Sequence, residues 1–237
     1  MPDAGEAQRP VEWGPKLHGY TPLIIPGNGQ NPRGASVDRK DMISLLDILG
    51  SDGWLTNFAV DAFFATIMPA FNAEKGLELQ GLAQRRVFLP AFVSKYVQES
   101  GRMPRGLDVT HTKAVLLTAC EIYVVFNLAP NRHWAVMRAQ RQRKRLEIFD
   151  SLRLVKKCHG RNMLKAISAY VHEDMSDWQV VVYQHGVPQQ TDAKSCGVFT
   201  CVIAKHLVED ASLPNIAEAI PEWRCWLARA LVQGAVA

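Results

Sequence analysis

The sequence lacks a long apolar run and also lacks a secretory signal. No apolar run approaches the roughly 18 residues that a helix needs to cross a bilayer. The first residues, Met1-Pro2-Asp3-Ala4-Gly5-Glu6, have neither the basic region nor the apolar region of a signal peptide. No membrane association is therefore expected, and the protein is expected to be soluble and intracellular.

Paired cysteines are also missing. The five cysteines are odd in number and irregularly spaced, which does not resemble a secreted disulfide framework. No CxxC pair and no Cys/His cluster with zinc spacing occurs, so no metal is expected. No P-loop-like glycine loop occurs either, and no cofactor is expected. The cysteines are Cys120, Cys158, Cys196, Cys201 and Cys225, and only Cys196 combines polar, turn-forming neighbours with a following glycine.

A strong excess of one charge is absent, since the formal net charge is +4. Five cations nevertheless lie within one stretch of eight residues: Arg138, Arg141, Arg143, Lys144 and Arg145. The favoured interpretation is a solvated hairpin turn. The other is a surface for an acidic partner or a nuclear import patch. Because no recognition helix or aromatic stacking pattern accompanies the stretch, nucleic acid is not an expected partner.

The chain divides at about residue 37. Residues 1–37 are rich in proline and glycine and show no sustained period, so they predict a flexible or surface-draped arm. A hydrophobic content of 48% allows a sizeable core in the remainder. Residues 38–237 are therefore predicted to form a single domain.

The periodicity of the domain predicts an α+β fold. Apolar residues recur at helical spacing in some segments, and apolar β-branched runs indicate strands in others. Helices come first, then strands, then helices and strands in alternation. We expect helices at 42–49, 60–67 (with Pro69 near the end), 91–97, 163–171, 197–208 and 218–232, and strands at 86–89, 114–120, 121–126, 133–138, 145–150 and 178–184.

A thiol, an imidazole and a carboxylate stand at ends of predicted elements. Cys196 lies where a polar loop becomes a helix, and a helix N-terminus favours an anion such as a thiolate. His133 begins one strand and Asp150 ends the next. If these strands pair antiparallel, the two side chains meet at one edge of the sheet. Each residue alone has an ordinary structural explanation, but the combination favours nucleophilic catalysis.

Four motifs in consistent order resemble the ubiquitin-like-protein-specific proteases, the SUMO (sentrin) deconjugating cysteine proteases to which the adenovirus maturation protease is more distantly related. The resemblance spans about residues 38–232 and implies a papain-like architecture, with a central mixed sheet flanked by helices and the nucleophile at a helix N-terminus. The motifs are Gly53-Trp54-Leu55-Thr56-Asn57, His133-Trp134, Phe149-Asp150-Ser151-Leu152, and Pro188-Gln189-Gln190 followed by Cys196-Gly197-Val198-Phe199.

The resemblance also implies roles for individual residues. Cys196 would be the nucleophile, His133 the general base, Asp150 its orienting carboxylate and Gln190 an oxyanion donor. Trp54 and Trp134 would wall a slot for a Gly-Gly tail, because only a chain without side chains fits between two aromatic faces. Gln189 and Gly197 would complete the substrate-binding residues.

The chain departs from the family pattern just before the nucleophile. Ser195 stands where the family usually carries an acidic residue, and Thr191-Asp192-Ala193-Lys194 replaces a turn that tends to contain Asn and Gly. Neither change removes a catalytic group, so activity is expected. The changes leave the preferred modifier open and indicate a divergent member, such as a transposon-borne, viral or bacterial-effector protease.

Several functions remain open at this stage. The first is a monomeric isopeptidase or peptidase that acts on a SUMO-like modifier and its conjugates, in the nucleus or cytoplasm of a eukaryote or in the host cell of a pathogen. The second is an endoprotease that matures a viral or mobile-element polyprotein. A third is an inactive module that binds a ubiquitin-like protein, against which the four catalytic residue types argue. Acetyl transfer is less favoured, because no phosphate-binding glycine loop is present.

Overall fold

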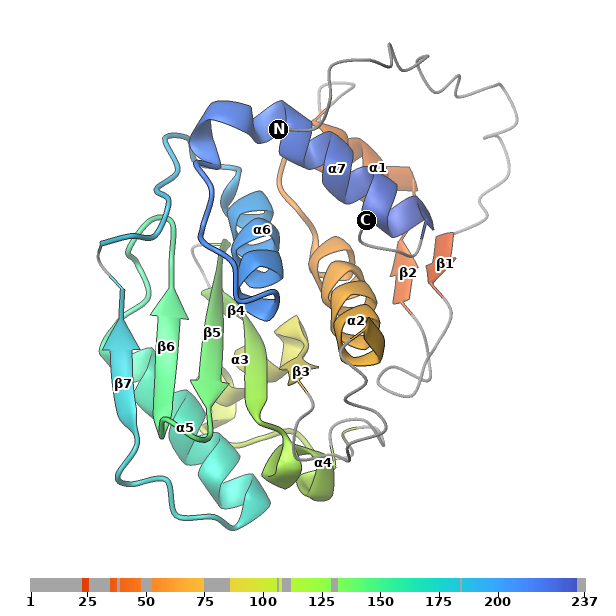
Figure 1. Cartoon of the computed structure of the whole chain (residues 1–237). Helices are drawn as coiled ribbons and strands as arrows, with labels where there is room; N and C mark the ends of the chain where they lie inside the picture. The colour runs from red at the N-terminus through yellow and green to blue at the C-terminus, as the bar shows by residue number, and fades with distance from the viewer. Residues whose placement is uncertain are drawn as a thin grey trace.

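The computed structural model describes residues 23–25, 35–37, 39–47, 53–74, 86–105, 107, 112–128, 132–183 and 185–233. Its centre is a five-stranded mixed sheet with the order β3-β4-β5-β6-β7 (Figure 1). The two outer pairs are parallel and the two inner pairs antiparallel. The strands are β3 (Arg86–Leu89), β4 (Glu121–Leu128), β5 (His133–Gln140), β6 (Arg145–Phe149) and β7 (Gln179–Val182).

Helices cover both faces of this sheet, as Figure 1 shows. On one face lie α2 (Asn57–Glu74) and α6 (Cys196–Val208), with α1 (Arg39–Leu46) and α7 (Ile220–Gln233) beyond them. On the other lie α3 (Ala91–Ser100), α4 (Lys113–Thr118) and α5 (Lys157–Val171). The sheet thus separates two apolar cores, and the α+β prediction is confirmed.

Strand β5 is the middle strand and is buried along all eight residues. Its side chains alternate between the cores: Trp134 and Val136 face α6, and Ala135 and Met137 face the opposite side. A strand covered on both faces needs a nearly continuous apolar run, which this sequence supplies. His133, at the start of β5, therefore stands on the most enclosed strand of the sheet.

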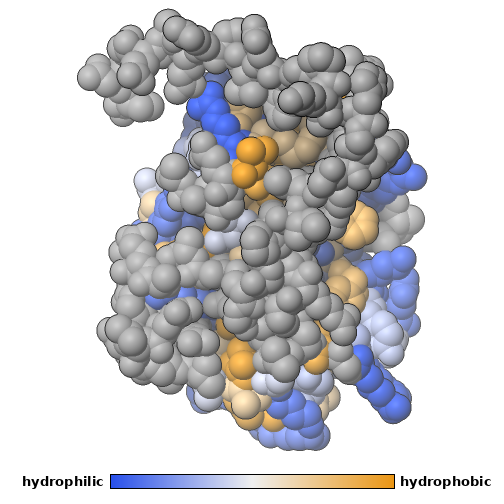
Figure 2. Space-filling model, turned by 90° about the vertical axis from the view of Figure 1, so that its right-hand side faces the viewer, coloured by the Kyte–Doolittle hydropathy of each residue, from blue (hydrophilic) through white to orange (hydrophobic). Residues whose placement is uncertain are grey.

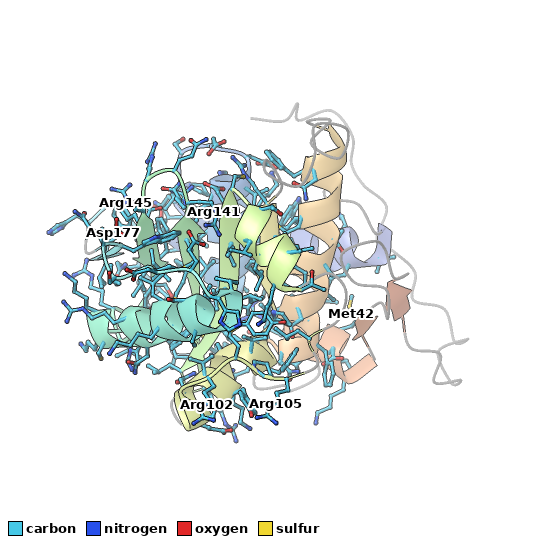
Figure 3. The ribbon with its side chains drawn as sticks, turned by 90° about the horizontal axis from the view of Figure 1, so that it is seen from below. Met42, Arg102, Arg105, Arg141, Arg145 and Asp177 are labelled. Atoms are coloured by element: carbon cyan, nitrogen blue, oxygen red, sulfur yellow. The ribbon has the colours of Figure 1, made fainter. Side chains whose placement is uncertain are left out.

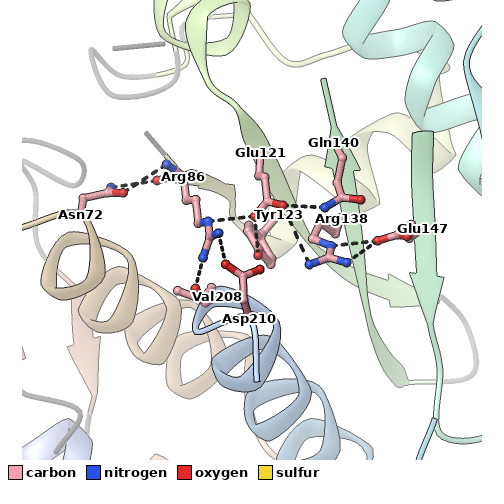
Figure 4. A network of polar contacts seen from close by, with 9 residues as sticks. All are labelled: Asn72, Arg86, Glu121, Tyr123, Arg138, Gln140, Glu147, Val208 and Asp210. Carbon is pink, nitrogen blue, oxygen red and sulfur yellow. Dashed lines mark hydrogen bonds and ion pairs between the residues drawn. The ribbon is translucent and has the colours of Figure 1, made fainter. Parts of the chain in front are cut away.

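A network of charged and polar side chains, most of them buried, ties the sheet to the C-terminal end of α6 (Figure 4). Arg86 pairs with Glu121 at 2.9 Å and with Asp210 at 2.7 Å, and its guanidinium also donates to the carbonyl oxygen of Val208. A cation is favourable there, because unpaired carbonyls give a helix C-terminus partial negative charge. The network thereby anchors the helix whose first residue is Cys196.

The turn of the β5–β6 hairpin holds Arg141, Arg143 and Lys144, which confirms the hairpin-turn interpretation for these residues. Arg138 and Arg145 belong to the strands themselves, and Arg138 is buried, so the stretch is not solvated throughout. Arg141 pairs with Glu173 and Lys144 with Asp177, each at 2.5 Å. Figure 3 shows Arg141, Arg145 and Asp177 on one side of the molecule. Because acidic residues of the same chain neutralise these cations, the stretch offers less positive charge to an acidic partner than its sequence indicates.

The strand predicted at 114–120 is wrong. Residues Lys113–Thr118 form helix α4, and the Thr112 hydroxyl caps it by accepting from the Val115 N–H at 3.4 Å. A short apolar run does not distinguish a buried strand from a buried helix, and the capping threonine favours the helix. The following strand was predicted at 121–126, and β4 confirms it with an extension to Leu128.

The second helix extends further than predicted, because α2 continues past Pro69 to Glu74. Phe71 is buried in the core, which favours the last turns despite the hydrogen bond that a proline removes. The Asn72 side chain also makes two hydrogen bonds with the backbone of Arg86, at 2.9 and 3.1 Å. Helix α2 is therefore fastened to the first strand of the sheet.

The other predicted elements agree apart from their ends. Strands β3, β5, β6 and β7 and helices α3, α5, α6 and α7 occupy the predicted segments, with a short 3-10 turn (Ala217–Ala219) before α7. Helix α1 ends at Leu46, and the rest of the predicted 42–49 segment, beyond Asp47, lies outside the described residues, as does Gln184 after β7.

Two short strands lie within the predicted arm. Strand β1 (Leu23–Ile25) pairs antiparallel with β2 (Ala35–Val37). The other residues of the arm are outside the described part of the chain, so the domain boundary at residue 38 stays a prediction.

Figure 2 views the side that carries these strands and, where it is not grey, shows apolar residues in small groups among polar ones. Within the described residues, no helix is both long enough and apolar enough to cross a membrane.

Candidate active site

Cys196 is the first residue of α6, at the end of the helix where backbone N–H groups are unpaired. Its side chain has no exposed surface, and its Sγ lies 4.0 Å from the carbonyl oxygen of Arg132. Because the sulfur is covered, a substrate carbonyl reaches it only when the residues around it move apart. The predicted nucleophile is thus at a helix N-terminus, in a closed site.

His133 and Asp150 meet at one end of the sheet, as antiparallel pairing of β5 and β6 requires. His133 Nε2 lies 2.5 Å from Asp150 Oδ1. The carboxylate also accepts hydrogen bonds from the backbone N–H groups of Leu152 at 2.8 Å and Val155 at 2.7 Å. Burial raises the pKa of Asp150, but the contact with His133 and these N–H groups outweigh burial, so its pKa is lowered. Asp150 is therefore held as an anion beside the imidazole.

The second nitrogen of His133, Nδ1, is left for the thiol. Nδ1 is buried and makes no hydrogen bond of good geometry to any described residue. Burial lowers the pKa of His133, but the contacts with Asp150 and with the nearby Cys196 thiol outweigh burial and raise the pKa from 6.5 to about 9. An imidazole that has one nitrogen on a carboxylate and the other without a partner, near a thiol, can take up the thiol proton and hold it.

Gln190 is fixed by hydrogen bonds at both ends of its amide. Its Oε1 accepts from the Ser151 hydroxyl at 2.6 Å, and its Nε2 donates to the Asp192 carbonyl at 2.7 Å. The backbone N–H of Gln190 also donates to the Ser151 carbonyl at 3.2 Å. A side-chain amide nitrogen carries two hydrogens, so one remains for an oxygen atom of a substrate.

The two tryptophans are joined through one backbone segment. Trp134 is buried, and its indole N–H donates to the carbonyl oxygen of Leu55 at 3.0 Å. Trp54, the residue before Leu55, is half-buried against the same core, and its carbonyl oxygen accepts from the Ser44 hydroxyl. The Trp54–Leu55 segment and the start of β5 are thus in direct contact. The assignment of both rings to a substrate slot stays a prediction.

Gly197 and Gln189 both shape the backbone around the site, one by close packing and one by hydrogen bonds. A Cβ atom at Gly197 would lie 2.7 Å from the Cβ of Leu55, closer than real Cβ contacts, so the Trp54–Leu55 segment can reach α6 only over a glycine. The Gln189 amide donates to the Val187 carbonyl at 3.0 Å and lies 3.4 Å from the Asp150 carbonyl. Gln189 therefore shapes the loop before Gln190, and a contact with substrate stays a prediction for both residues.

Sequence reasoning missed two residues of the site. Ser151, known from the sequence only as part of a motif, binds Gln190 twice. Arg224 of α7 is buried and lies 3.5 Å from the Ser195 hydroxyl. Ser151 could have been found from the sequence, because its hydroxyl directly follows Asp150. An arginine in an amphipathic helix looks the same whether it faces solvent or the interior, so no sequence signal identified Arg224.

Among the described residues, no group of three or more His, Cys, Asp or Glu side chains could hold a metal ion.

Comparisons with known proteins give one matching family. Residues 94–229 match the Ulp1 protease family, C-terminal catalytic domain, and this range contains His133, Asp150, Gln190 and Cys196. No curated protein sequence matches the chain.

Solved structures of such proteases share the fold. The C-terminal Ulp1 protease domain in complex with Smt3, the yeast ortholog of SUMO, is 17% identical, with a TM-score of 0.66 over 93% of this chain and 92% of that one. The catalytic domain of the Chaetomium thermophilum Ulp1-like SUMO protease is 18% identical, with a TM-score of 0.68 over 92% and 84% of the two chains. A de-sumoylating protease is 13% identical, with a TM-score of 0.60 over 90% and 89%. At these identities the likeness shows the fold, and the predicted papain-like architecture is confirmed.

Proposed function

Because this chain belongs to the Ulp1 protease family, we propose that it is a cysteine protease that cleaves after the C-terminal Gly-Gly of a SUMO-like modifier. The observation that carries the proposal is the 2.5 Å contact between His133 Nε2 and Asp150 Oδ1 beside a cysteine that begins a helix. This arrangement provides a nucleophile, a base and an orienting carboxylate.

The chemistry proceeds in two steps. In the first, the Cys196 sulfur attacks the carbonyl carbon of the modifier's last glycine, and His133 Nδ1 holds the thiol proton. The bond to the leaving amine then breaks, His133 gives that amine a proton, and an acyl-thioester remains on Cys196. In the second step, water loses a proton to His133 and attacks the thioester. This releases the modifier's carboxylate and restores the thiol.

The oxygen of the attacked carbonyl becomes negatively charged in both steps. Gln190 Nε2 and the backbone N–H of Cys196 are the donors that this oxyanion needs. The first is held by Ser151 and Asp192, and the second stands at the N-terminus of α6. Donors fixed before the reaction stabilise developing charge without reorganisation.

A diglycine tail is the substrate that suits this proposal. In the proposed slot, a chain that passes Trp54 and Trp134 can carry no side chain, which selects glycine by excluding every Cβ. The related Ulp1 domain binds Smt3, a SUMO ortholog, which supports a SUMO-like modifier here. The corresponding place of action would be the nucleus or cytoplasm of a eukaryotic cell, or the host cell of a pathogen.

A panel of ubiquitin-like proteins with C-terminal diglycine electrophiles tests the proposal. We expect at least one SUMO-like probe to form an adduct with the wild-type protein at Cys196, located by mass spectrometry, and none with Cys196→Ala. Cys158→Ala is the matched control, because Cys158 is exposed and lies on α5. Binding without an adduct would favour an inactive binding module. Cleavage of a polyprotein but of no modifier would favour a maturation protease.

A further inference from the structure

Arg224 is a buried cation that joins three segments near the nucleophile. Its side chain belongs to α7, and the residue is 3% exposed. Nη1 donates to the carbonyl oxygens of Leu45 at 2.8 Å and Ser44 at 3.3 Å, at the end of α1. Nη2 donates to the carbonyl oxygen of Gly53 at 2.8 Å, directly before Trp54. One guanidinium therefore fixes the backbone that leads into the proposed substrate slot.

The same guanidinium faces the residue before the nucleophile. Nη2 lies 3.5 Å from the hydroxyl of Ser195, a long contact, and Ser195 is 1% exposed. The Ser195 hydroxyl donates to Asp192 Oδ2 at 2.6 Å. Since its proton points to Asp192, the hydroxyl presents a lone pair to Arg224. Arg224, Ser195 and Asp192 thus form a continuous row of polar groups, here called the Arg224 bridge.

Asp192 holds the nucleophile loop from its other side. Its Oδ1 accepts from the backbone N–H groups of Lys194 at 3.0 Å and Ser195 at 2.8 Å. Asp192 is exposed, so the bridge runs from the protein surface to the buried guanidinium. Its loop would lose three hydrogen bonds to a charged acceptor if the carboxylate were removed.

The charges of the bridge balance one another. A buried cation without a compensating anion is costly. Burial lowers the pKa of Arg224, and the anions of Asp47 and Asp192 oppose that effect. Burial raises the pKa of Asp192, but its hydrogen bonds from Ser195 and Lys194 and the charge of Arg224 outweigh burial and lower it. Asp47 is thus the stronger and Asp192 the weaker of the two carboxylates that favour the charged form of Arg224.

A second contact joins the same two segments. Lys194 Nζ lies 2.5 Å from Asp47 Oδ2, directly after α1. A Cβ atom on Gly53 would lie 2.6 Å from Asp47 Oδ1 and 2.9 Å from Lys194 Cδ, so the segments pack closely. The loop before Cys196 and the segment before Trp54 are thus held together at two points.

We propose that Arg224 is a positioning residue for this protease, and that Asp192, acting through the Ser195 hydroxyl, shares with Asp47 in neutralising it and so fixes Cys196 relative to the Trp54 segment. The proposal rests on the proposed function for the roles of Cys196 and Trp54. It assigns a purpose to the serine before the nucleophile: Ser195 connects a carboxylate three residues upstream to the cation that orders the slot.

The test is a set of rescue variants. Asp192→Asn removes the anion, and Ser195→Ala removes the connecting hydroxyl. Ser195→Asp, added to Asp192→Asn, puts a carboxylate directly in front of Arg224. Arg224→Lys keeps the charge but loses the fork that reaches Leu45 and Gly53 together. The matched control is Asp174→Asn, because Asp174 is also exposed and accepts from a backbone N–H two residues later, at 2.9 Å from Ser176.

For Asp192→Asn we expect kcat on a diglycine modifier substrate to fall about tenfold, because a small displacement of a nucleophile costs rate steeply. The melting temperature should fall by about 3 °C. Adding Ser195→Asp should restore both quantities, whereas Asp174→Asn should leave kcat unchanged. A general loss of stability would not be repaired by a carboxylate at one particular neighbouring position.

The outcomes separate the two proposals. The bridge is wrong if Asp192→Asn and Ser195→Ala keep kcat and melting temperature within about twofold and 1 °C of wild type, or if Ser195→Asp restores neither. If no modifier probe reacts with the wild-type protein, the proposed function fails, while rescue of the melting temperature still supports the bridge. If Arg224→Lys does not fold, the Asp192 and Ser195 variants decide the question.

Discussion

Ser151 holds Gln190 by two hydrogen bonds, one through its hydroxyl and one through its carbonyl. The hydroxyl donates to Gln190 Oε1 at 2.6 Å, and the carbonyl accepts from the Gln190 N–H at 3.2 Å. Ser151 follows Asp150 directly, so the carboxylate that orients His133 and the amide proposed for the oxyanion are set by adjacent residues. A shift of this turn would displace both groups together.

Ser151→Ala should lower kcat about tenfold with little change in KM, because the Gln190 amide loses the bond that aims it. Gln190→Ala should cost on the order of 10²-fold or more, as for loss of one oxyanion donor. Since Ser151 acts through Gln190, the double variant should be no slower than Gln190→Ala. Steady-state kinetics on a fluorogenic diglycine substrate measure all three. The control is Ser168→Ala in α5, which removes a hydrogen bond from the Ser168 hydroxyl to the Glu173 carbonyl. Additive losses would contradict the assignment.

The His133–Asp150 pair should make stability depend on pH above neutrality. The pKa of His133 is raised in the folded protein to about 9. Its contribution is therefore complete below about 6.5, its pKa in the unfolded chain, and is lost as the pH rises through 9. The difference corresponds to about 3 kcal/mol. Urea unfolding at pH 6 and pH 10 should show this loss in wild type and little of it in Asp150→Asn. An equal loss in both proteins would contradict the prediction.

Asp61 should make stability fall with pH in a lower window. It accepts from the Ala91 N–H at 2.8 Å at the start of α3, and burial raises its pKa from 3.8 to about 7. Because the folded protein favours the protonated acid, this contribution is complete below 3.8 and is lost as the pH rises through 7. Asp61→Asn keeps an acceptor without the charge and should be more stable than wild type at pH 8, by about 4 kcal/mol at most. Asp174→Asn, an exposed site, should show no such gain. Equal stability of Asp61→Asn and wild type at pH 8 would refute the prediction.

Gly197→Ala should impair both stability and turnover. The new Cβ would lie 2.7 Å from the Leu55 Cβ, and neither atom can move without its backbone. Overpacking of this kind costs about 1–3 kcal/mol. Because Gly197 adjoins Cys196, kcat should fall as well. A Cβ atom added at Gly186 would meet nothing within 4 Å but φ there is +77°, so Gly186→Ala should lose some stability and keep its kcat. Normal turnover in Gly197→Ala would show that the contact with Leu55 does not fix the position of Cys196.

Glu147→Gln should destabilise the sheet strongly. Glu147 is completely buried and binds Arg138 and Arg145, each at 2.6 Å, and the Tyr183 hydroxyl at 2.8 Å. Removing the anion leaves the buried Arg138 guanidinium with only a longer contact to Glu121, at 3.9 Å. The cost should therefore approach the roughly 3–5 kcal/mol of an uncompensated buried charge. Asp177→Asn breaks an exposed pair with Lys144 and should cost about 1 kcal/mol or less. Chemical denaturation measures the free energy of unfolding of both variants. Equal losses would contradict the prediction that the buried Glu147 contributes more to stability than the exposed Asp177.

The sequence identified the protease family and the parts of the site that are local. A histidine that begins one strand and an aspartate that ends the next meet by antiparallel pairing alone. A cysteine before a glycine, where a loop becomes a helix, needs only local signals. Local signals failed at 114–120, where an apolar β-branched run is a capped helix. They also failed at Pro69, where burial of Phe71 outweighed a residue that usually ends helices.

Only the tertiary structure decided how these parts are held. Gly53, Ser195 and Arg224 come from segments that are far apart in the chain, yet one guanidinium contacts the first two. The pairing of Ser151 with Gln190 likewise joins positions 39 residues apart. Hydrophobic periodicity specifies which face of an element is buried. It does not specify which polar group a buried side chain meets, because that partner depends on how distant elements pack.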